Sequence, residues 1–363
     1  MLSDYGASVV KVGPVPSADA TPAQPSFFAY SGHRGMQRVL IDLKDDDGRE
    51  AFLALATSAD VVVESFRPGV VDRLGIGYQG VQERNPGIIY CSTSGYGQEG
   101  PHAQWAGHDL NYLAVGGFLA MSTPGADGAP PLPGATIADA AAGGMQAALA
   151  ITAAVAGRTI SGKGAFLDVS VADGVLWLMS LPIDESLALH TAPAPGHDVL
   201  SGRYACYGVY RTRDDKWLAV GAIEPKFFAN LCHALDCPEV IPLQLDDDAQ
   251  LGIRETFAAS FASRDRDKWV EMLAGADTCV SPVLAVSEIA DDPQFSSRHV
   301  VTSTMHPTEG AIRQLAPLLA GMDNVAPGSS LPDMTATATA DLLTEAGVDD
   351  ETIAQWISRR VVA

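Results

Sequence analysis

The chain has 363 residues, 47% of them hydrophobic and 18% charged, which is long enough for two domains and typical of a globular protein. Asp and Glu number 44 against 23 Lys and Arg, so the formal net charge is -21. A field of this sign repels nucleic acid and anionic membrane surfaces, which argues against both as partners.

Short β-branched runs alternate with amphipathic segments in the first third of the chain. Strands are predicted at 8–12, 61–64 and 88–93, and helices at 47–57 and 80–84. This alternation is typical of βαβ units, so we predict an α/β fold whose large domain is a Rossmann-like parallel sheet.

Polar or Gly-rich loops follow two of these strands, ESFRPG at 64–69 and SGYGQEGP at 94–101. Ligands of open parallel sheets bind at the carboxyl ends of the strands, so we expect the functional site in these loops. Because the whole chain is acidic, a pocket for an anionic ligand must be locally basic.

An Ala- and Gly-rich segment at 135–155 carries no charge after Asp139. Such a helix packs closely against its neighbours, and we expect it to be buried. The free N–H groups at its start, at the positive end of the helix dipole, could meet negative charge on a ligand.

The second half of the chain shows a different pattern, typical of a smaller α+β domain. The predicted elements are a linker at 191–202, a hairpin turn at 213–216, helices near 225–236 and 265–274, a Gly-, Pro- and Thr-rich connection at 327–340, and a helical pattern at 341–360 that breaks at Gly347.

Four parts of the chain follow from these elements. Residues 1–190 form the large α/β domain, 191–202 the linker and 203–300 the small α+β domain. Residues 301–363 return to the large domain and end in a helix that packs on it.

The five cysteines are odd in number and form no CxxC pair, which predicts reduced thiols. Cys232, His233 and Cys237 have the spacing of metal ligands, but they lie in an amphipathic run typical of a core helix, so no metal site is predicted. There is no secretory signal pattern, and no uninterrupted apolar run reaches the roughly 18 residues of a membrane span. A cytoplasmic protein is expected.

His108, Asp139 and Glu224 are ionisable residues in otherwise apolar surroundings. Partly buried ionisable groups often mark functional sites, but structural ion pairs produce the same pattern. The residues alone leave both interpretations open.

Several ordered motifs resemble the family III (CaiB/BaiF) CoA-transferases, and two of them resemble its α-methylacyl-CoA racemase branch. The general motifs are DLK at 42–44, ADVVVESFRPGVVDRLGIG at 59–77, IIYCSTSGYGQEGP at 88–101, SGKGAFLDVSVADG at 161–174 and SRDRDKWVEMLAGADTCVSPVL at 263–284. The racemase motifs are AGHDLNY at 106–112 and VGAIEPKFF at 220–228.

The resemblance implies a catalytic set of His108, Asp139 and Glu224, with Glu224 holding the histidine. It implies an enzyme that inverts the α-carbon of 2-methylacyl-CoA thioesters by two-base 1,1-proton transfer through an enolate. A proton beside a thioester carbonyl is only weakly acidic, so a base is needed on each face, together with donors for the enolate oxygen. No metal or redox cofactor is implied.

The resemblance also implies a set of coenzyme A contacts. Arg is suited to bidentate contacts with phosphate, although each arginine could instead be a surface ion-pair partner. The implied contacts are Arg67 and Arg73 at the nucleotide, Ile41, Leu43 and Lys44 near the adenine and phosphates, and Asp109 in the pocket beside His108.

Family members form interlocked homodimers, in which the large domain of one subunit meets the small domain of the other, and they act in the breakdown of branched fatty acids or sterol side chains. They usually begin further upstream, so the resemblance predicts that a central strand is missing here and that an extended chain would be more stable. The segment VKVGPVPS at 10–17 lacks the acidic or second basic residue often found after that strand, so one phosphate contact is expected to be missing.

Two alternatives remain open. A family III CoA-transferase would use Asp139 as a nucleophile and form acyl-anhydride and thioester intermediates. A truncated member of the family would bind acyl-CoA without turnover. His108 and Glu224 favour the racemase, because a transferase does not need that pair.

Overall fold

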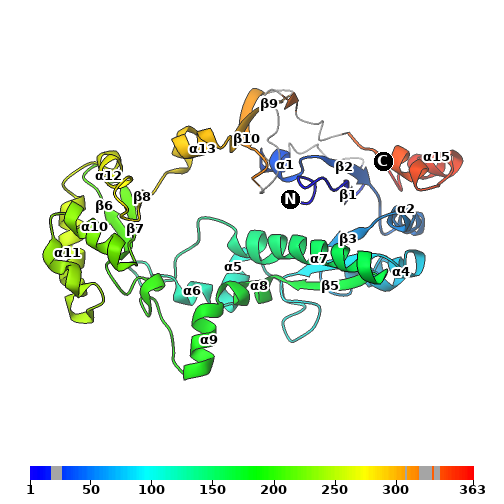
Figure 1. Ribbon diagram of the computed structural model, residues 1–363. Helices are drawn as coiled ribbons and strands as arrows, with labels where there is room; N and C mark the ends of the chain where they lie inside the picture. The colour runs from blue at the N-terminus through cyan, green and yellow to red at the C-terminus, as the bar shows by residue number, and fades with distance from the viewer. Residues whose placement is uncertain (18–26, 307–308, 319–328, 331–335) are drawn as a thin grey trace. The chain divides into compact units, whose positions relative to one another are not determined.

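The computed structural model describes residues 1–17, 27–306, 309–318, 329–330 and 336–363 (Figure 1). The chain divides into two compact units. The first consists of Met1–Gly116, Ala135–Leu178 and Ala290–Ala363, and the second of Gly117–Gly134 and Met179–Ile289. The chain thus enters the second unit twice, and residues 179–190 belong to it. The predicted domain borders stay a prediction, because compact units need not be independently folding domains.

Parallel strands form the centre of the first unit, as predicted for the α/β fold. They lie in separate sheets of order β1-β2 and β3-β4-β5, whereas one sheet was expected. The strands β1, β3 and β4 confirm the predictions, and β2 and β5 were missed because Arg, Gln or Asp interrupts their apolar residues. The strands are β1 (Val9–Gly13), β2 (Met36–Leu40), β3 (Val61–Glu64), β4 (Ile89–Ser94) and β5 (Ala165–Ser170).

The remaining elements of the first unit are helices and a small sheet of order β10-β9-β11. They are α1 (Phe27–Gly32), α2 (Asp46–Thr57), α3 (Val70–Arg73), α4 (Tyr78–Arg84), α5 (Asp109–Val115), η1 (Ala138–Met145), α7 (Gln146–Ser161), α8 (Val171–Leu178), α13 (Pro293–Ser297), α14 (Thr339–Glu345), α15 (Asp350–Ser358), β9 (Val301–His306), β10 (Gly310–Leu315) and β11 (Ser329–Ser330).

The C-terminal helices lie beside α2 in the first unit (Figure 1). Ile353 and Trp356 of α15 join Ala51 of α2 and Val39 of β2 in one buried apolar cluster. The predicted break at Gly347 is confirmed, since this residue has φ 88° between α14 and α15. Most of the predicted connection at 327–340 lies outside the described residues.

The Ala- and Gly-rich segment is not the buried α-helix that was expected. It begins as the π-helix η1 and continues as α7. Within the segment Ala138–Ser161, an 18-residue stretch has a mean hydropathy of 1.4, so length and composition alone would allow this helix to cross a membrane. Only 22% of that stretch is buried. One face packs on β4 and β5, but Leu149 and Ile160 are 72% and 90% exposed. Nothing among the described residues covers these two side chains on the other face.

The second unit contains an antiparallel sheet of order β6-β7-β8 covered by helices. The predicted hairpin and the helices near 225–236 and 265–274 are confirmed, and α11 was missed. One apolar cluster fills the unit and includes Cys232 and Cys237, as expected for core residues. The elements are α6 (Phe118–Met121), α9 (Ser180–Leu189), β6 (Tyr207–Arg211), β7 (Trp217–Gly221), α10 (Pro225–Ala234), α11 (Gln250–Phe261), α12 (Arg266–Leu273) and β8 (Val280–Pro282), with short 3-10 turns η2 (Val199–Ser201), η3 (Pro238–Leu243) and η4 (Asp247–Ala249); a further turn, η5 (Val286–Asp291), crosses the border to the first unit.

Candidate active site

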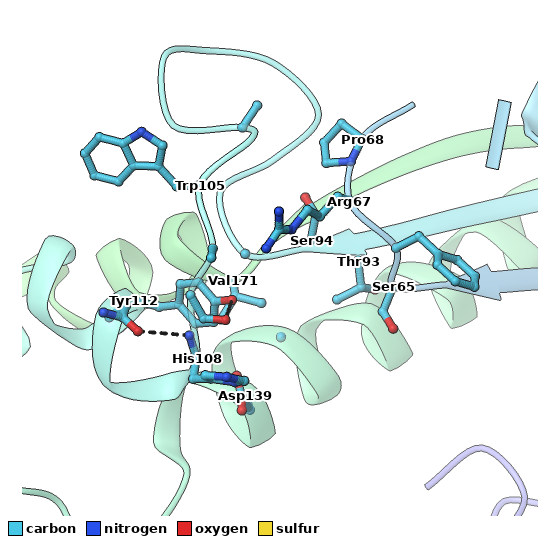
Figure 2. A pocket seen from close by; sticks show the side chains of 17 residues that line it. Ser65, Arg67, Pro68, Thr93, Ser94, Trp105, His108, Tyr112, Asp139 and Val171 are labelled. Carbon is cyan, nitrogen blue, oxygen red and sulfur yellow. Dashed lines mark hydrogen bonds between the residues drawn. The ribbon is translucent and has the colours of Figure 1, made fainter. Parts of the chain in front are cut away.

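A cavity of about 620 Å³ lies at the carboxyl ends of β3 and β4 in the first unit (Figure 2). The two loops that were expected to form the site contribute to its wall, and α5, η1 and α8 complete it. The lining residues are Ser65, Phe66, Arg67, Pro68, Thr93, Ser94, Gly95, Ala103, Trp105, Ala106, Gly107, His108, Asn111, Tyr112, Asp139, Gly143 and Val171.

His108 lies at the start of α5, where its main chain is held and its side chain is exposed. Its N–H donates to Asn111 Oδ1 at 3.0 Å, which Figure 2 shows as a dashed line, and its carbonyl accepts from the Asn111 N–H at 2.8 Å. This arrangement fixes the backbone from which the imidazole reaches the cavity.

Asp139 lies in the first turn of η1 and is tied to α5 through Asp109. The Asp139 N–H donates to Asp109 Oδ1 at 2.9 Å. Partial desolvation, and then the Asp109 carboxylate, raise the pKa of Asp139, while His108 opposes them by favouring its charged form. Asp139 is therefore a stronger base than an ordinary carboxylate.

Two of the N–H groups that were expected to be free at the start of the Asp139 helix have hydrogen-bond partners. Asp109 accepts from the Asp139 N–H, and the carbonyl of Thr136 accepts from the Ala140 N–H at 3.0 Å. The expectation that this helix start supplies donors for an enolate is wrong for these two groups, because a main-chain carbonyl and the neighbouring carboxylate already accept from them.

Tyr112 closes one side of the cavity. Its hydroxyl donates to the Gly107 carbonyl at 2.7 Å, and a Cβ on Gly95 would come within 2.4 Å of its ring, so only glycine fits there. Burial, followed by the charge of Asp139, raises the pKa of Tyr112, and the positive charge of Arg67 opposes this rise. Arg67 therefore acts electrostatically on the same cavity.

The sequence pattern of the family described as CoA-transferase family III matches residues 1–332. The chain belongs to CoA-transferase family III. The α-methylacyl-CoA racemase of Homo sapiens is 34% identical over 366 residues, covering 100% of this chain and 92% of that protein. The acetyl-CoA:oxalate CoA-transferase of Acetobacter aceti is 30% identical over 317 residues, covering 83% of this chain and 80% of that protein.

A solved structure of a CaiB/BaiF family protein from Brucella suis has a similar fold. Its TM-score with this chain is 0.75 at 25% identity, covering 95% of this chain and 93% of that one. The family and the α/β fold expected from the sequence motifs are confirmed. Since the relatives include both racemases and CoA-transferases, the family comparison fixes the enzyme class only at this coarser level.

Of the binding residues implied by family III, Arg67 lines the cavity, whereas Asp109, which was expected in the pocket, is not among its lining residues. Arg67 lines it together with His108 and Asp139. Arg73 and Lys44 are exposed outside its lining, and Leu43 packs partly against the cluster that also contains Ile41. The Ile41 side chain is fully buried there, so a contact between Ile41 and a ligand would involve its main chain.

Glu224 belongs to the second unit, whereas His108 and Asp139 belong to the first. It is exposed at the start of α10, where its carbonyl accepts from the Phe228 N–H at 3.0 Å. Its action on His108 stays a prediction.

Several cavity residues were missed by the sequence analysis, among them Ser94, Trp105 and Tyr112. Ser94 and Tyr112 lie inside the family motifs, which was the available signal, and Trp105 directly precedes one of them. Within the described residues, no three His, Cys, Asp or Glu side chains are grouped as metal ligands would be.

Proposed function

We propose that this chain is an α-methylacyl-CoA racemase, which inverts the α-carbon of 2-methylacyl-CoA thioesters. The observation that carries the proposal is that an imidazole and a carboxylate from different elements, His108 and Asp139, line one cavity. The similarity to α-methylacyl-CoA racemases over the whole chain supports it. Branched fatty acyl or sterol side-chain thioesters would be its substrates.

In the proposed reaction one base removes the α-proton, and the electrons of the C–H bond form a carbon–carbon double bond while the carbonyl electrons move to oxygen. The other base then delivers a proton to the opposite face. Asp139 with a raised pKa suits both the removal and the delivery of a proton, because a carboxylate of higher pKa is a stronger base and holds a proton more readily. Such chemistry needs no metal or redox cofactor.

The remaining residues would bind and orient. Glu224 would hold the His108 imidazole, and the charged ends of Arg67, Arg73 and Lys44 would bind the phosphates, with Leu43 and the main chain of Ile41 near the adenine. Asp109 would act through Asp139, whose N–H it accepts.

We further propose an interlocked homodimer in the cytoplasm, in which Glu224 of the partner subunit approaches His108. The uncovered apolar face of α7, with Leu149 and Ile160, supports a second copy as its occupant, as does the exposed Trp177 on α8. A membrane is the other possible occupant of an apolar helix of this length, but η1 begins this helix and carries Asp139 into the cavity.

A CoA-transferase is the second candidate, because the Asp139 carboxylate is exposed in the cavity and relatives include CoA-transferases. Asp139 would then attack the thioester carbonyl and carry the acyl group. Hydroxylamine discriminates between the two: it traps an acyl group on a transferase and leaves a racemase unmodified.

The test of the racemase is deuterium entry at the α-carbon of single epimers of 2-methylacyl-CoA in heavy water. His108→Ala should lower the rate of exchange from one epimer by roughly a hundred- to ten-thousand-fold. Asp139→Ala should lower the rate from the other epimer to a similar extent. Glu224→Gln should weaken exchange from the same epimer as His108→Ala.

Two outcomes would overturn the proposal. Near-normal exchange from both epimers in both alanine variants would exclude a two-base mechanism. No exchange by the unaltered chain, with acyl-CoA still bound, would favour a protein that binds without turnover. Circular dichroism of each variant separates these outcomes from misfolding.

A further inference from the structure

One buried polar group in the cavity wall has no partner. Ser94 is the last residue of β4, it lines the cavity, and it is only 7% exposed. No group among the described residues hydrogen-bonds its Oγ. A buried hydroxyl without a partner is unusual in a folded protein, because the hydrogen bonds it made to water in the unfolded chain are lost.

The neighbouring serine on the next strand has a different environment. Ser170 of β5 pairs in register with Ser94 and is also buried. Its Oγ accepts from the Asp173 N–H at 3.2 Å, and it does not line the cavity. The missing partner is therefore specific to the serine that faces the site.

The cavity has bases on its helical side and donors on its strand side. His108 and Asp139 come from α5 and η1, whereas Ser94 and Arg67 come from the ends of β4 and β3. Two N–H groups at the start of η1 are already occupied, so these two are not free to donate to a substrate oxygen that gains negative charge. Rotation about the single Cα–Cβ bond brings the Ser94 hydroxyl to any of its staggered positions.

We propose that Ser94 donates a hydrogen bond to the thioester carbonyl oxygen of the substrate and strengthens it as this oxygen becomes an enolate. The proposal rests on the racemase function and names a further residue of that site. The α-proton passes to one base and the other base returns a proton, while Ser94 keeps its own. A donor held in place before reaction stabilises the transition state more than the bound substrate.

The experiment compares Ser94→Ala, Ser94→Thr and the matched control Ser170→Ala by steady-state α-deuterium exchange and by thermal unfolding. Loss of one such donor typically lowers kcat by about a hundredfold or more. We expect that loss in Ser94→Ala with little change in KM, and recovery of most of it in Ser94→Thr, which keeps a hydroxyl.

The control should show the opposite behaviour. Ser170→Ala breaks an internal hydrogen bond, so it should lower the melting temperature and leave kcat near normal. Ser94→Ala breaks none, so its melting temperature should not fall.

Four outcomes would overturn the assignment. If the unaltered chain is active, an unchanged kcat and KM in Ser94→Ala would exclude a hydrogen bond from Ser94 to the substrate. A raised KM at normal kcat would indicate that Ser94 binds the coenzyme A part of the substrate and not the reacting carbonyl. Equal loss of kcat in Ser94→Ala and Ser170→Ala would indicate a general effect on the strands. If the unaltered chain exchanges no deuterium, the racemase function fails and the Ser94 assignment fails with it.

Discussion

The two units of the chain differ in how they bury apolar side chains. In the second unit, one cluster contains aromatic residues from α10, α11 and α12 together with residues of β6 and β7. In the first unit, smaller clusters lie on either side of the parallel strands, and the outer faces of α7 and α8 are exposed. The first unit, which carries the candidate active site, therefore leaves an apolar helix face exposed beside its core, and in the second unit the leucines of α9 are exposed as well.

The second unit thus has one large apolar cluster of its own, whereas the clusters of the first unit are smaller and leave the outer face of α7 exposed. If a second copy covers that face, substitutions on the outer face of α7 should weaken association and, with it, activity. Substitutions matched between the units can test this.

The largest effect on stability is expected in the core of the second unit. Phe257→Ala removes a fully buried ring of α11 and should destabilise this unit by about 3–5 kcal/mol. Leu251→Ala on the same helix, where the side chain is 71% exposed, should change stability by less than about 0.5 kcal/mol. Guanidinium unfolding followed by circular dichroism measures both. Equal effects would show that this cluster is not a close-packed core.

An intermediate effect is expected on the uncovered face of the first unit. Leu149→Asp should raise the dimer dissociation constant roughly ten- to a hundredfold, because burying a leucine side chain contributes about 1.5–3 kcal/mol. Leu251→Asp is the matched control in the second unit, since the two leucines are 72% and 71% exposed. Sedimentation of dilution series measures the constants. A dimer unaffected by Leu149→Asp would exclude α7 from the interface.

The smallest effect concerns Asp139, which lines the cavity, and the Asp109 carboxylate that accepts its N–H. Because the Asp109 charge raises the pKa of Asp139, Asp109→Asn should lower that pKa while its amide oxygen still accepts the Asp139 N–H. Exchange from the epimer that Asp139 deprotonates falls as the pH drops through this pKa, so the fall should occur at lower pH in the variant. Asp46→Asn, an exposed carboxylate on α2, is the control. An unmoved acid limb would show that Asp109 only positions η1.

Local sequence predicted the strands of the first unit that are continuous apolar runs, such as Val61–Glu64. It missed β2 and β5, whose polar residues interrupt that pattern, because their strand state depends on pairing with distant segments. Helix α11 was missed although Ile253, Phe257 and Phe261 recur at four-residue spacing, a signal that a helical search would have detected.

The location of the site was predictable, because ligands of parallel sheets gather where the strands end. That the Ser94 hydroxyl is buried without a hydrogen-bond partner was not predictable, since it depends on which polar groups the rest of the fold brings near it. The exposure of α7 was not predictable either. An Ala-rich helix has the same composition whether its own chain or another copy covers it.

The π-helix η1 has a consequence for protein engineering. Its i→i+5 bonds place more residues in each turn than an α-helix does, so the angular position of each α7 residue relative to Asp139 differs from the usual 100° per residue. A helical wheel drawn straight through Met145 would assign the wrong residues to the outer face. Any transplant of α7 from a relative must therefore include η1 as one piece, or the carboxylate and the apolar face will lose their alignment.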